Sequence, residues 1–195
     1  MKKSFGIAAA CLALLVAATT GHGYTIDDVI IEYWAGSGDD EAVLVVDFGS
    51  SANYAFGYRW NGSAVSWDML DAIDAAGSLE KTATNYGTVT APGWLVDTIS
   101  YDGHTMGVGN YFANFFISDD GENWTVPNYG VSSRSLSDGV FDGFGEAYSE
   151  WYGLGHPDNV YEPADPPTTP IPEPAALCLL AVGAPALLRR RRPRA

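Results

Sequence analysis

Cysteine is almost missing from this chain of 195 residues. Only Cys11 and Cys178 occur, and each lies in an apolar run near one end of the chain. The residues between these runs contain no thiol, which excludes an internal disulfide and a cysteine-ligated metal site there. The fold must therefore rest on an ordinary apolar core, and roughly 130 residues are enough to form one.

Basic residues are equally scarce in the middle of the chain. From Tyr24 to Pro170 there are only Arg59, Lys81 and Arg134, against all but one of the 24 acidic residues, which gives a net charge of about −20. A surface this acidic repels phosphate backbones, so we expect no nucleic-acid partner. The same charge would attract divalent cations weakly.

Histidine and catalytic motifs are also rare. His104 and His156 stand 52 residues apart without companion ligands, so we expect no metal site and no cofactor. The acidic stretch at 119–123 lacks the spacing of a calcium loop and favours a hairpin turn. No serine lies in a Gly-x-Ser-x-Gly motif, and no glycine-rich phosphate loop follows a strand. We therefore predict that the chain is not an enzyme and assign no catalytic residue.

One enzymatic alternative stays open. Glycoside hydrolysis needs only a pair of carboxylates, and the many acidic residues of the chain could supply one without any recognisable motif. A secreted polysaccharide hydrolase is therefore the alternative to a non-enzymatic protein.

The N-terminal segment is basic at first and then apolar. Met1-Lys2-Lys3 precedes a run of Ala, Leu, Ile and Val over 7–18, and small residues follow to Gly23. This is the three-part plan of a secretory signal peptide, and the apolar run is too short to span a bilayer. We predict a signal peptide over residues 1–23 and an exported protein.

The C-terminal segment, residues 171–195, joins a short motif to an apolar run and a basic cluster. In order, these are Pro172, Glu173 and Pro174, the apolar run over 175–188, and Arg189, Arg190, Arg191 and Arg192. As a helix the run would measure about 21 Å, against roughly 30 Å of hydrocarbon in a bilayer. Arginines would stay at the cytoplasmic interface. We expect a weak, transient anchor in the inner membrane.

This order of motif, apolar run and arginines resembles the PEP-CTERM sorting signal of bacteria. In that family a membrane protease-transpeptidase, an exosortase, processes the exported chain near the motif. The resemblance covers about the last 25 residues and implies an exosortase-type enzyme as a partner. It also implies sorting to the cell envelope or extracellular matrix, with exopolysaccharide or surface proteins as further partners. A plain membrane anchor behind a proline-rich linker is the alternative.

The sequence between the ends predicts an α+β domain over residues 24–152 and a proline-rich linker over 153–170. Prolines favour an extended linker that would hold the domain away from the membrane. Runs of β-branched and aromatic residues, separated by turn residues, indicate short strands, the first two of them around a turn. These strands are expected at 29–34, 42–48, 54–60, 94–103 and 110–118, with further ones near Trp124, at 133–136 and at 141–148.

One helix is predicted, from Ser66 to Ala76, and a polar loop follows it. Ser66 would cap the helix, and Gly77 would end it. The apolar side chains of Met69, Leu70 and Ile73 fall on one face, which would pack across the sheet.

The body of the chain also resembles the transcobalamin C-terminal-like domain, a β-grasp module of exported bacterial proteins. The likeness runs from about residue 43 to 144. It rests on Leu70, Ala72, Trp94, Trp124, Gly130 and the pair Asp138-Gly139. It implies a β-grasp-like mixed sheet with one short helix, and a cobalamin-like small molecule as an alternative ligand.

Aromatic residues make up 13% of the chain, and their ordinary role is to fill a core. They could also stack on a sugar or a flat ring. The candidates are Trp60, Trp67, Trp94, Tyr111, Trp124 and Tyr129. If the sheet carries a ligand, we expect Trp94 and Trp124 to be exposed and to bind it. Taken together, the sequence predicts an exported, non-enzymatic binding or structural module.

Overall fold

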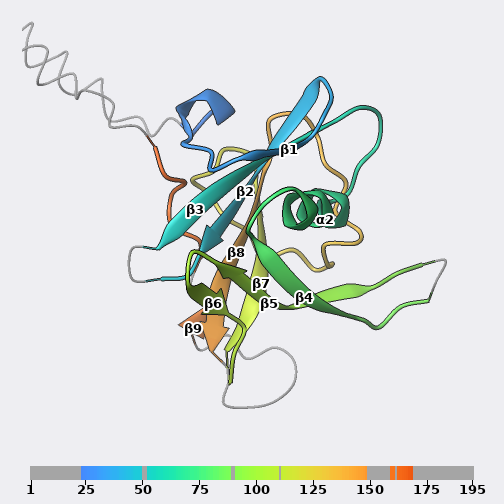
Figure 1. Cartoon of the computed structure of the whole chain (residues 1–195), viewed down its shortest axis with the longest axis vertical. Helices are drawn as coiled ribbons and strands as arrows, with labels where there is room; N and C mark the ends of the chain where they lie inside the picture. Colours follow the sequence, from blue (N-terminus) through green and yellow to red (C-terminus); the bar gives the residue numbers. More distant parts are fainter. Residues whose placement is uncertain are drawn as a thin grey trace, which may run out of the picture. The chain divides into compact units, whose positions relative to one another are not determined.

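The computed structural model describes residues 23–49, 52–88, 91–109, 111–148, 159–160 and 162–168. These residues form a mixed six-stranded sheet, a smaller three-stranded sheet and one α-helix (Figure 1). The predicted α+β class, with a mixed sheet and one short helix, is confirmed. Within the described ranges, no helix is long and apolar enough to cross a bilayer.

The larger sheet is mixed, with the parallel pair β2 and β8 near its centre. It contains β1 (Trp34–Gly36), β2 (Asp40–Asp47), β3 (Asn53–Trp60), β7 (Tyr111–Ser118), β8 (Phe141–Tyr148) and β9 (Asn159–Val160). The strand order is β1-β3-β2-β8-β7, and β9 pairs with the end of β8. β2 is antiparallel to β3 and parallel to β8. Residues 42–46 of β2 are all buried, because both faces of the sheet are covered.

The smaller sheet has the order β4 (Glu80–Asn85), β5 (Trp94–Tyr101) and β6 (His104–Met106). The sequence predicted a polar loop where β4 lies, and this prediction was wrong. Hydroxyl groups hold the polar strand: Thr82 and Thr98 bond across the two strands at 2.7 Å. The strand expected at 94–103 ends at Tyr101, and a tight turn with positive φ at Asp102 and Gly103 leads into β6.

The helix α2 (Ser66–Ala76) has the predicted bounds and buries Met69, Leu70 and Ile73. Its N-terminal cap differs from the prediction. The carboxylate of Asp68 accepts the N–H of Val65 at 2.9 Å, while the side chain of Ser66 is buried and points to another strand. Aspartate at the third helical position can cap the helix in this way, which frees Ser66 for the core.

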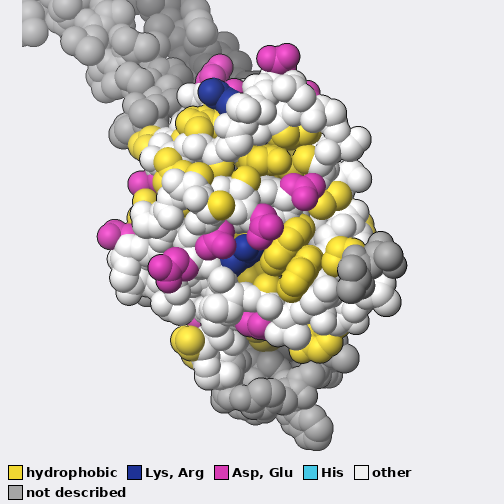
Figure 2. Space-filling view, turned by 45° about the vertical axis from the view of Figure 1, so that its right-hand side comes forward, with side chains coloured by type: hydrophobic (Ala, Val, Ile, Leu, Met, Phe, Trp, Pro, Cys, Tyr) yellow, Lys and Arg dark blue, Asp and Glu magenta, His cyan; other side chains and the backbone are white. Residues whose placement is uncertain are grey.

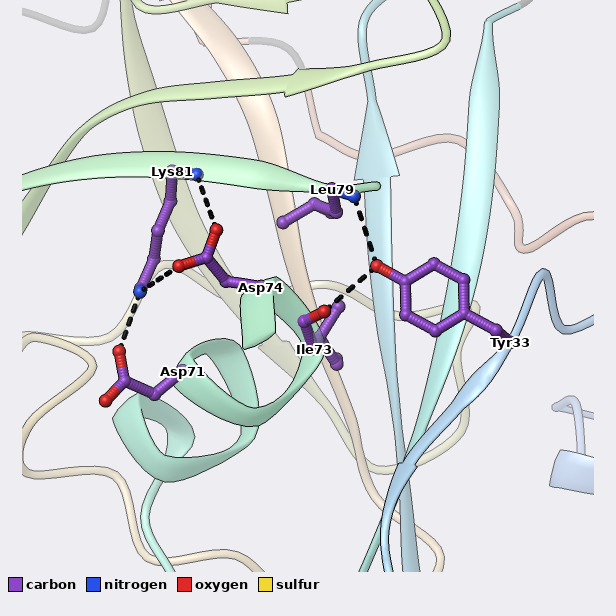
Figure 3. A network of polar contacts seen from close by, with 6 residues as sticks. All are labelled: Tyr33, Asp71, Ile73, Asp74, Leu79 and Lys81. Atoms are coloured by element: carbon purple, nitrogen blue, oxygen red, sulfur yellow. Dashed lines mark hydrogen bonds and ion pairs between the residues drawn. The ribbon is translucent and has the colours of Figure 1, made fainter. Parts of the chain in front are cut away.

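The end of α2 is tied to its neighbours by Tyr33. The ring of Tyr33 lies so close to Gly77 that a Cβ there would come within 2.2 Å of it. The Tyr33 hydroxyl donates to the carbonyl of Ile73 at 3.0 Å and accepts the N–H of Leu79 at 3.2 Å (Figure 3). One side chain therefore links the segment before β1, the end of α2 and the start of β4.

Three of the predicted strands are shorter or absent. The region 29–34 follows a 3-10 helix, η1 (Ile26–Asp28), and only Trp34–Gly36 forms a strand, which pairs with β3 in parallel rather than with β2. The ring of Trp34 covers Gly57 of β3, where no side chain blocks it. The regions near Trp124 and at 133–136 contribute only isolated bridges, Ile117 with Thr125 and Val65 with Ser135.

The described part of the predicted linker packs against the domain. Thr168 forms a bridge with Val29, and the N–H of Ile30 donates to the carbonyl of Pro167 at 2.7 Å. Pro163 and Pro166 are buried. Residues 162–168 are thus part of the folded unit rather than a free spacer, because their prolines offer apolar surface to the sheet.

The two faces of the larger sheet support separate cores. Leu44, Val46 and Phe56 point to the cluster that contains α2 and the smaller sheet. Val43 and Val45 point to the opposite cluster. This alternation follows from the two-residue period of a strand.

Candidate functional site

An apolar groove of about 180 Å³ lies between β5, β7 and the segment 126–131. Its walls include Trp94 and Leu95 of β5, Phe112 and Asn114 of β7, and Val126 and Tyr129 of the segment. No charged side chain lines it. Four large side chains around it are strongly exposed: Leu95 (52%), Phe112 (41%), Val126 (54%) and Tyr129 (41%).

Pro127 explains why the groove is open. Thr125 and Ile117 exchange two backbone hydrogen bonds of 2.9 Å, as the start of a strand added to β7 would. The next such pair would join residues 127 and 115. Pro127 has no N–H to donate, so the chain leaves β7 at this point. It then runs towards α2, where the N–H of Trp67 donates to the carbonyl of Val131 at 3.1 Å.

Trp94, in the wall of the groove, stacks on the indole of Trp67 behind it. The rings of Trp67 and Trp94 lie 4.5 Å apart and 8° from parallel. The ammonium of Lys81 lies 4.8 Å from the centre of the Trp67 ring, on the α2 side. Such a cation over an indole adds to the stacking and restricts the ring. The backbone N–H of Trp94 donates to Ser132 Oγ at 2.9 Å, which fixes Trp94 from the other side.

Lys81 is held by two carboxylates of α2. Its Nζ donates to Asp71 at 2.7 Å and to Asp74 at 3.1 Å (Figure 3). Only 7% of the Lys81 side chain is exposed. Burial lowers the pKa of Lys81, but the hydrogen bonds to Asp71 and Asp74 outweigh it and raise the pKa above its ordinary value. Lys81 is therefore a charged anchor for Trp67. Figure 2 shows acidic side chains around a basic one, next to an apolar area.

The sequence matches no known family model and no curated protein.

The two predicted ligand-binding tryptophans have different positions. Trp94 is half-buried in the groove wall, as a ligand contact would require. Trp124 is only 9% exposed, so the expectation that it is an exposed platform was wrong. Its ring covers Gly143 of β8, where a Cβ would come within 2.8 Å of both the indole and Pro163. Trp124 belongs to the core cluster on the opposite face of the sheet.

The remaining aromatic candidates divide between core and groove. Trp60 is buried and stacks on Tyr58, whereas Tyr129 lines the groove. Sequence reasoning missed Leu95, Phe112 and Val126, and Pro127 is the signal that could have found them. The sorting residues Pro172, Glu173 and Pro174, and Arg189, Arg190, Arg191 and Arg192, lie outside the described residues.

One buried carboxyl group has the raised pKa that a general acid would need. Asp142 on β8 is fully buried, accepts the hydroxyl of Ser66 and lies 3.5 Å from Arg134 Nε. Burial raises the pKa of Asp142 to about 6, although Ser66 and Arg134 act in the opposite direction. Asp142 does not line the groove, and its partners enclose it. We therefore interpret it as a structural link between β8, α2 and the loop of Arg134.

The acidic turn at 119–123 is closed by its own side chains. The carboxylate of Asp120 accepts the backbone N–H groups of Asn123 and Glu122 at 2.8 and 3.0 Å. The hydrogen bond from Asn123 is the largest cause of the lowered pKa of Asp120. Within the described ranges, no group of three or more histidine, cysteine or acidic side chains is placed to hold a metal ion.

Proposed function

We propose that this chain is an exported, non-enzymatic binding module that holds its ligand in the groove between β5 and β7. The groove itself is the observation that carries the proposal. It is uncharged and rimmed by exposed apolar side chains, in a domain that is otherwise strongly acidic. Apolar depressions with few polar groups are the usual form of a ligand site, and exposed apolar patches mark interaction surfaces.

The terminal segments support the proposed export and localisation of this module. The signal-peptide pattern favours export, and the PEP-CTERM-like tail favours a transient anchor in the inner membrane, an exosortase-type processing enzyme, and delivery to the cell envelope or matrix. Mass spectrometry of the extracellular fraction should find a chain that begins near Tyr24 and lacks Arg189–Ala195. Recovery of the intact 195-residue chain from the cytosol would contradict export.

Binding in the groove is tested by following tryptophan fluorescence while the purified protein is titrated with oligosaccharides, peptides and cobalamin. Trp94 lines the groove, so a ligand there should change the emission. Replacement of Tyr129 by Ala should weaken binding, because the ring lies at the rim. Tyr86→Ala is the matched control, since Tyr86 is 75% exposed and does not line the groove.

The enzymatic alternative is tested on the same protein with a panel of polysaccharides. We expect no hydrolysis. Turnover that a single Asp or Glu replacement abolishes would contradict a non-enzymatic role.

A further inference from the structure

Among the described residues, one edge of the larger sheet, along β7, is largely unpaired. There β8 pairs with β7 on one side, and on the other side only Thr125 pairs with it, at Ile117. Since Ile117 points its peptide groups away from β8, the two-residue alternation points those of Phe115 and Ala113 the same way. In the described part of the chain, no strand pairs with β7 at these two residues.

The strand β7 itself has none of the sequence features that normally protect an edge. Natural edge strands are blunted by lysine, by proline, by bulges or by short length. β7 has eight residues without a charge, a proline or a glycine, and its pairing with β8 runs without a shift from Tyr111 to Ser118. A regular, uncharged edge of this length is a template for another extended chain.

The groove lies along this same edge. Four consecutive residues of β7, 112–115, contribute to its wall. The exposed side chains of Leu95, Phe112 and Val126 stand around the outward peptide groups. An added strand could therefore pair with β7 through its backbone and place alternate apolar side chains against this rim.

Charge selects the kind of chain that fits. Glu146 on β8 lies directly opposite Ala113 and is half-buried. Burial raises the pKa of Glu146, and no hydrogen bond or ion pair to another described residue satisfies its carboxylate. The body of the chain, with its net charge of about −20, repels an acidic peptide and a second copy of itself. A cationic side chain on the ligand would pair with the Glu146 carboxylate and would also be attracted by the negative charge of the body.

We propose that the open edge of β7 binds an extended, basic polypeptide segment by strand addition, with a lysine or arginine of the segment paired to Glu146. This inference rests on the proposed binding function and names the class of ligand for the same groove. The partner is a protein segment of alternating apolar and basic residues, held by backbone bonds to Ala113 and Phe115.

The first test compares short capped peptides of alternating valine and lysine with peptides of alternating valine and glutamate, added to the whole purified protein. We expect the basic peptide to bind at least about tenfold more tightly, which corresponds to about 1.4 kcal/mol. Amide hydrogen exchange should slow at Ala113 and Phe115 when it binds. Equal affinity for the two peptides would overturn the role of charge.

The second test separates strand addition from simple charge attraction. N-methylation of the basic peptide at alternate residues removes the donors on one edge only. Methylation of the edge that faces β7 should weaken binding by about tenfold, whereas methylation of the other edge should not. If both methylated peptides bind like the parent, strand addition is wrong.

The third test concerns the carboxylate. Glu146→Gln should reduce affinity for the basic peptide and flatten its salt dependence, while Glu80→Gln, an exposed acid on β4, should leave both unchanged. An oligosaccharide that binds in the groove when no peptide does would overturn strand addition and leave the binding module intact. Failure of every probe at the groove would overturn both proposals.

Discussion

The two edges of the larger sheet are treated in opposite ways. At the β1 edge the strand has three residues, and the guanidinium of Arg59 lies 4.2 Å from the centre of the Trp34 ring. Arg59 also donates to Glu41 at 2.8 Å. At the β7 edge the strand has eight residues, and in the part of the chain that the structure describes only Thr125 pairs with it from outside. The short length of β1, the ring of Trp34 and the charge of Arg59 protect the first edge. The unprotected second edge is therefore a property of β7 and not of the whole sheet.

The largest expected effect comes from the helix that supports the protected edge. α2 packs against β1 and β3, and Leu70 is buried on that side. Leu70→Ala should lower the free energy of unfolding by about 2–5 kcal/mol. Asp71→Ala is the control, because Asp71 is exposed and its ion pair should contribute less than about 1 kcal/mol. Chemical denaturation measures both, and equal losses would contradict this placement of the helix.

The next effect concerns the support behind the open edge, where Asp142 lies on β8. Its pKa of about 6 exceeds the ordinary 3.8 because of burial. Between these pH values the folded state binds a proton that the unfolded state does not, so stability falls as pH rises from about 4 to 6. Asp142→Asn should remove this dependence, worth about 3 kcal/mol at most. The free energy of unfolding is measured from pH 4 to 7 in both proteins. The same pH dependence in the two would refute this role of Asp142.

A smaller effect should follow from crowding the protected edge. Gly57→Ala places a Cβ about 2.4 Å from the Trp34 ring, which must then move off β3. We expect a loss of about 1–3 kcal/mol, typical of overpacking. Gly93→Ala is the matched control, because its nearest atoms lie at 3.4 Å, an ordinary contact. Thermal unfolding of the two variants gives the difference, and equal midpoints would show that Trp34 does not need Gly57.

The smallest effect should come from Arg59. Arg59→Met keeps much of the aliphatic cover on Trp34 but removes the ion pair with Glu41 and the cation. Because the side chain is 43% exposed, we expect a loss of no more than about 1 kcal/mol, further reduced by salt. Denaturation at low and high salt measures it. A loss that is large and independent of salt would mean that Arg59 acts by packing rather than by charge.

Local signals explain what could be predicted from the sequence. The predicted bounds of α2 were correct because its signals are local: an acidic first turn, an apolar face and Gly77 all lie in or next to the helix. The β2 and β3 strands were found by composition. β4 was missed because Thr82 is held by Thr98, which is distant in the sequence. The burial of Trp124 was missed because Gly143 makes room for it on another strand.

The candidate site was predicted only in part. Trp94, which the sequence singled out, lines the groove. The groove itself depends on where the chain leaves β7, and Pro127 decides this. Pro127 is visible in the sequence, but the sequence does not show that Thr125, two residues earlier, pairs with β7. The docking of residues 162–168 was hidden for a similar reason, since prolines are typical of spacers and of apolar covers alike.

The contact between Tyr24 and Asp165 sets limits on how the chain can be trimmed. The Tyr24 hydroxyl donates to the Asp165 carboxylate at 2.8 Å, and this bond raises the pKa of Tyr24 to about 12. This hydrogen bond joins residues near the two ends of the folded unit. A chain shortened past Tyr24 at one end, or past Asp165 at the other, would lose this bond, and the latter change would also remove the buried Pro166.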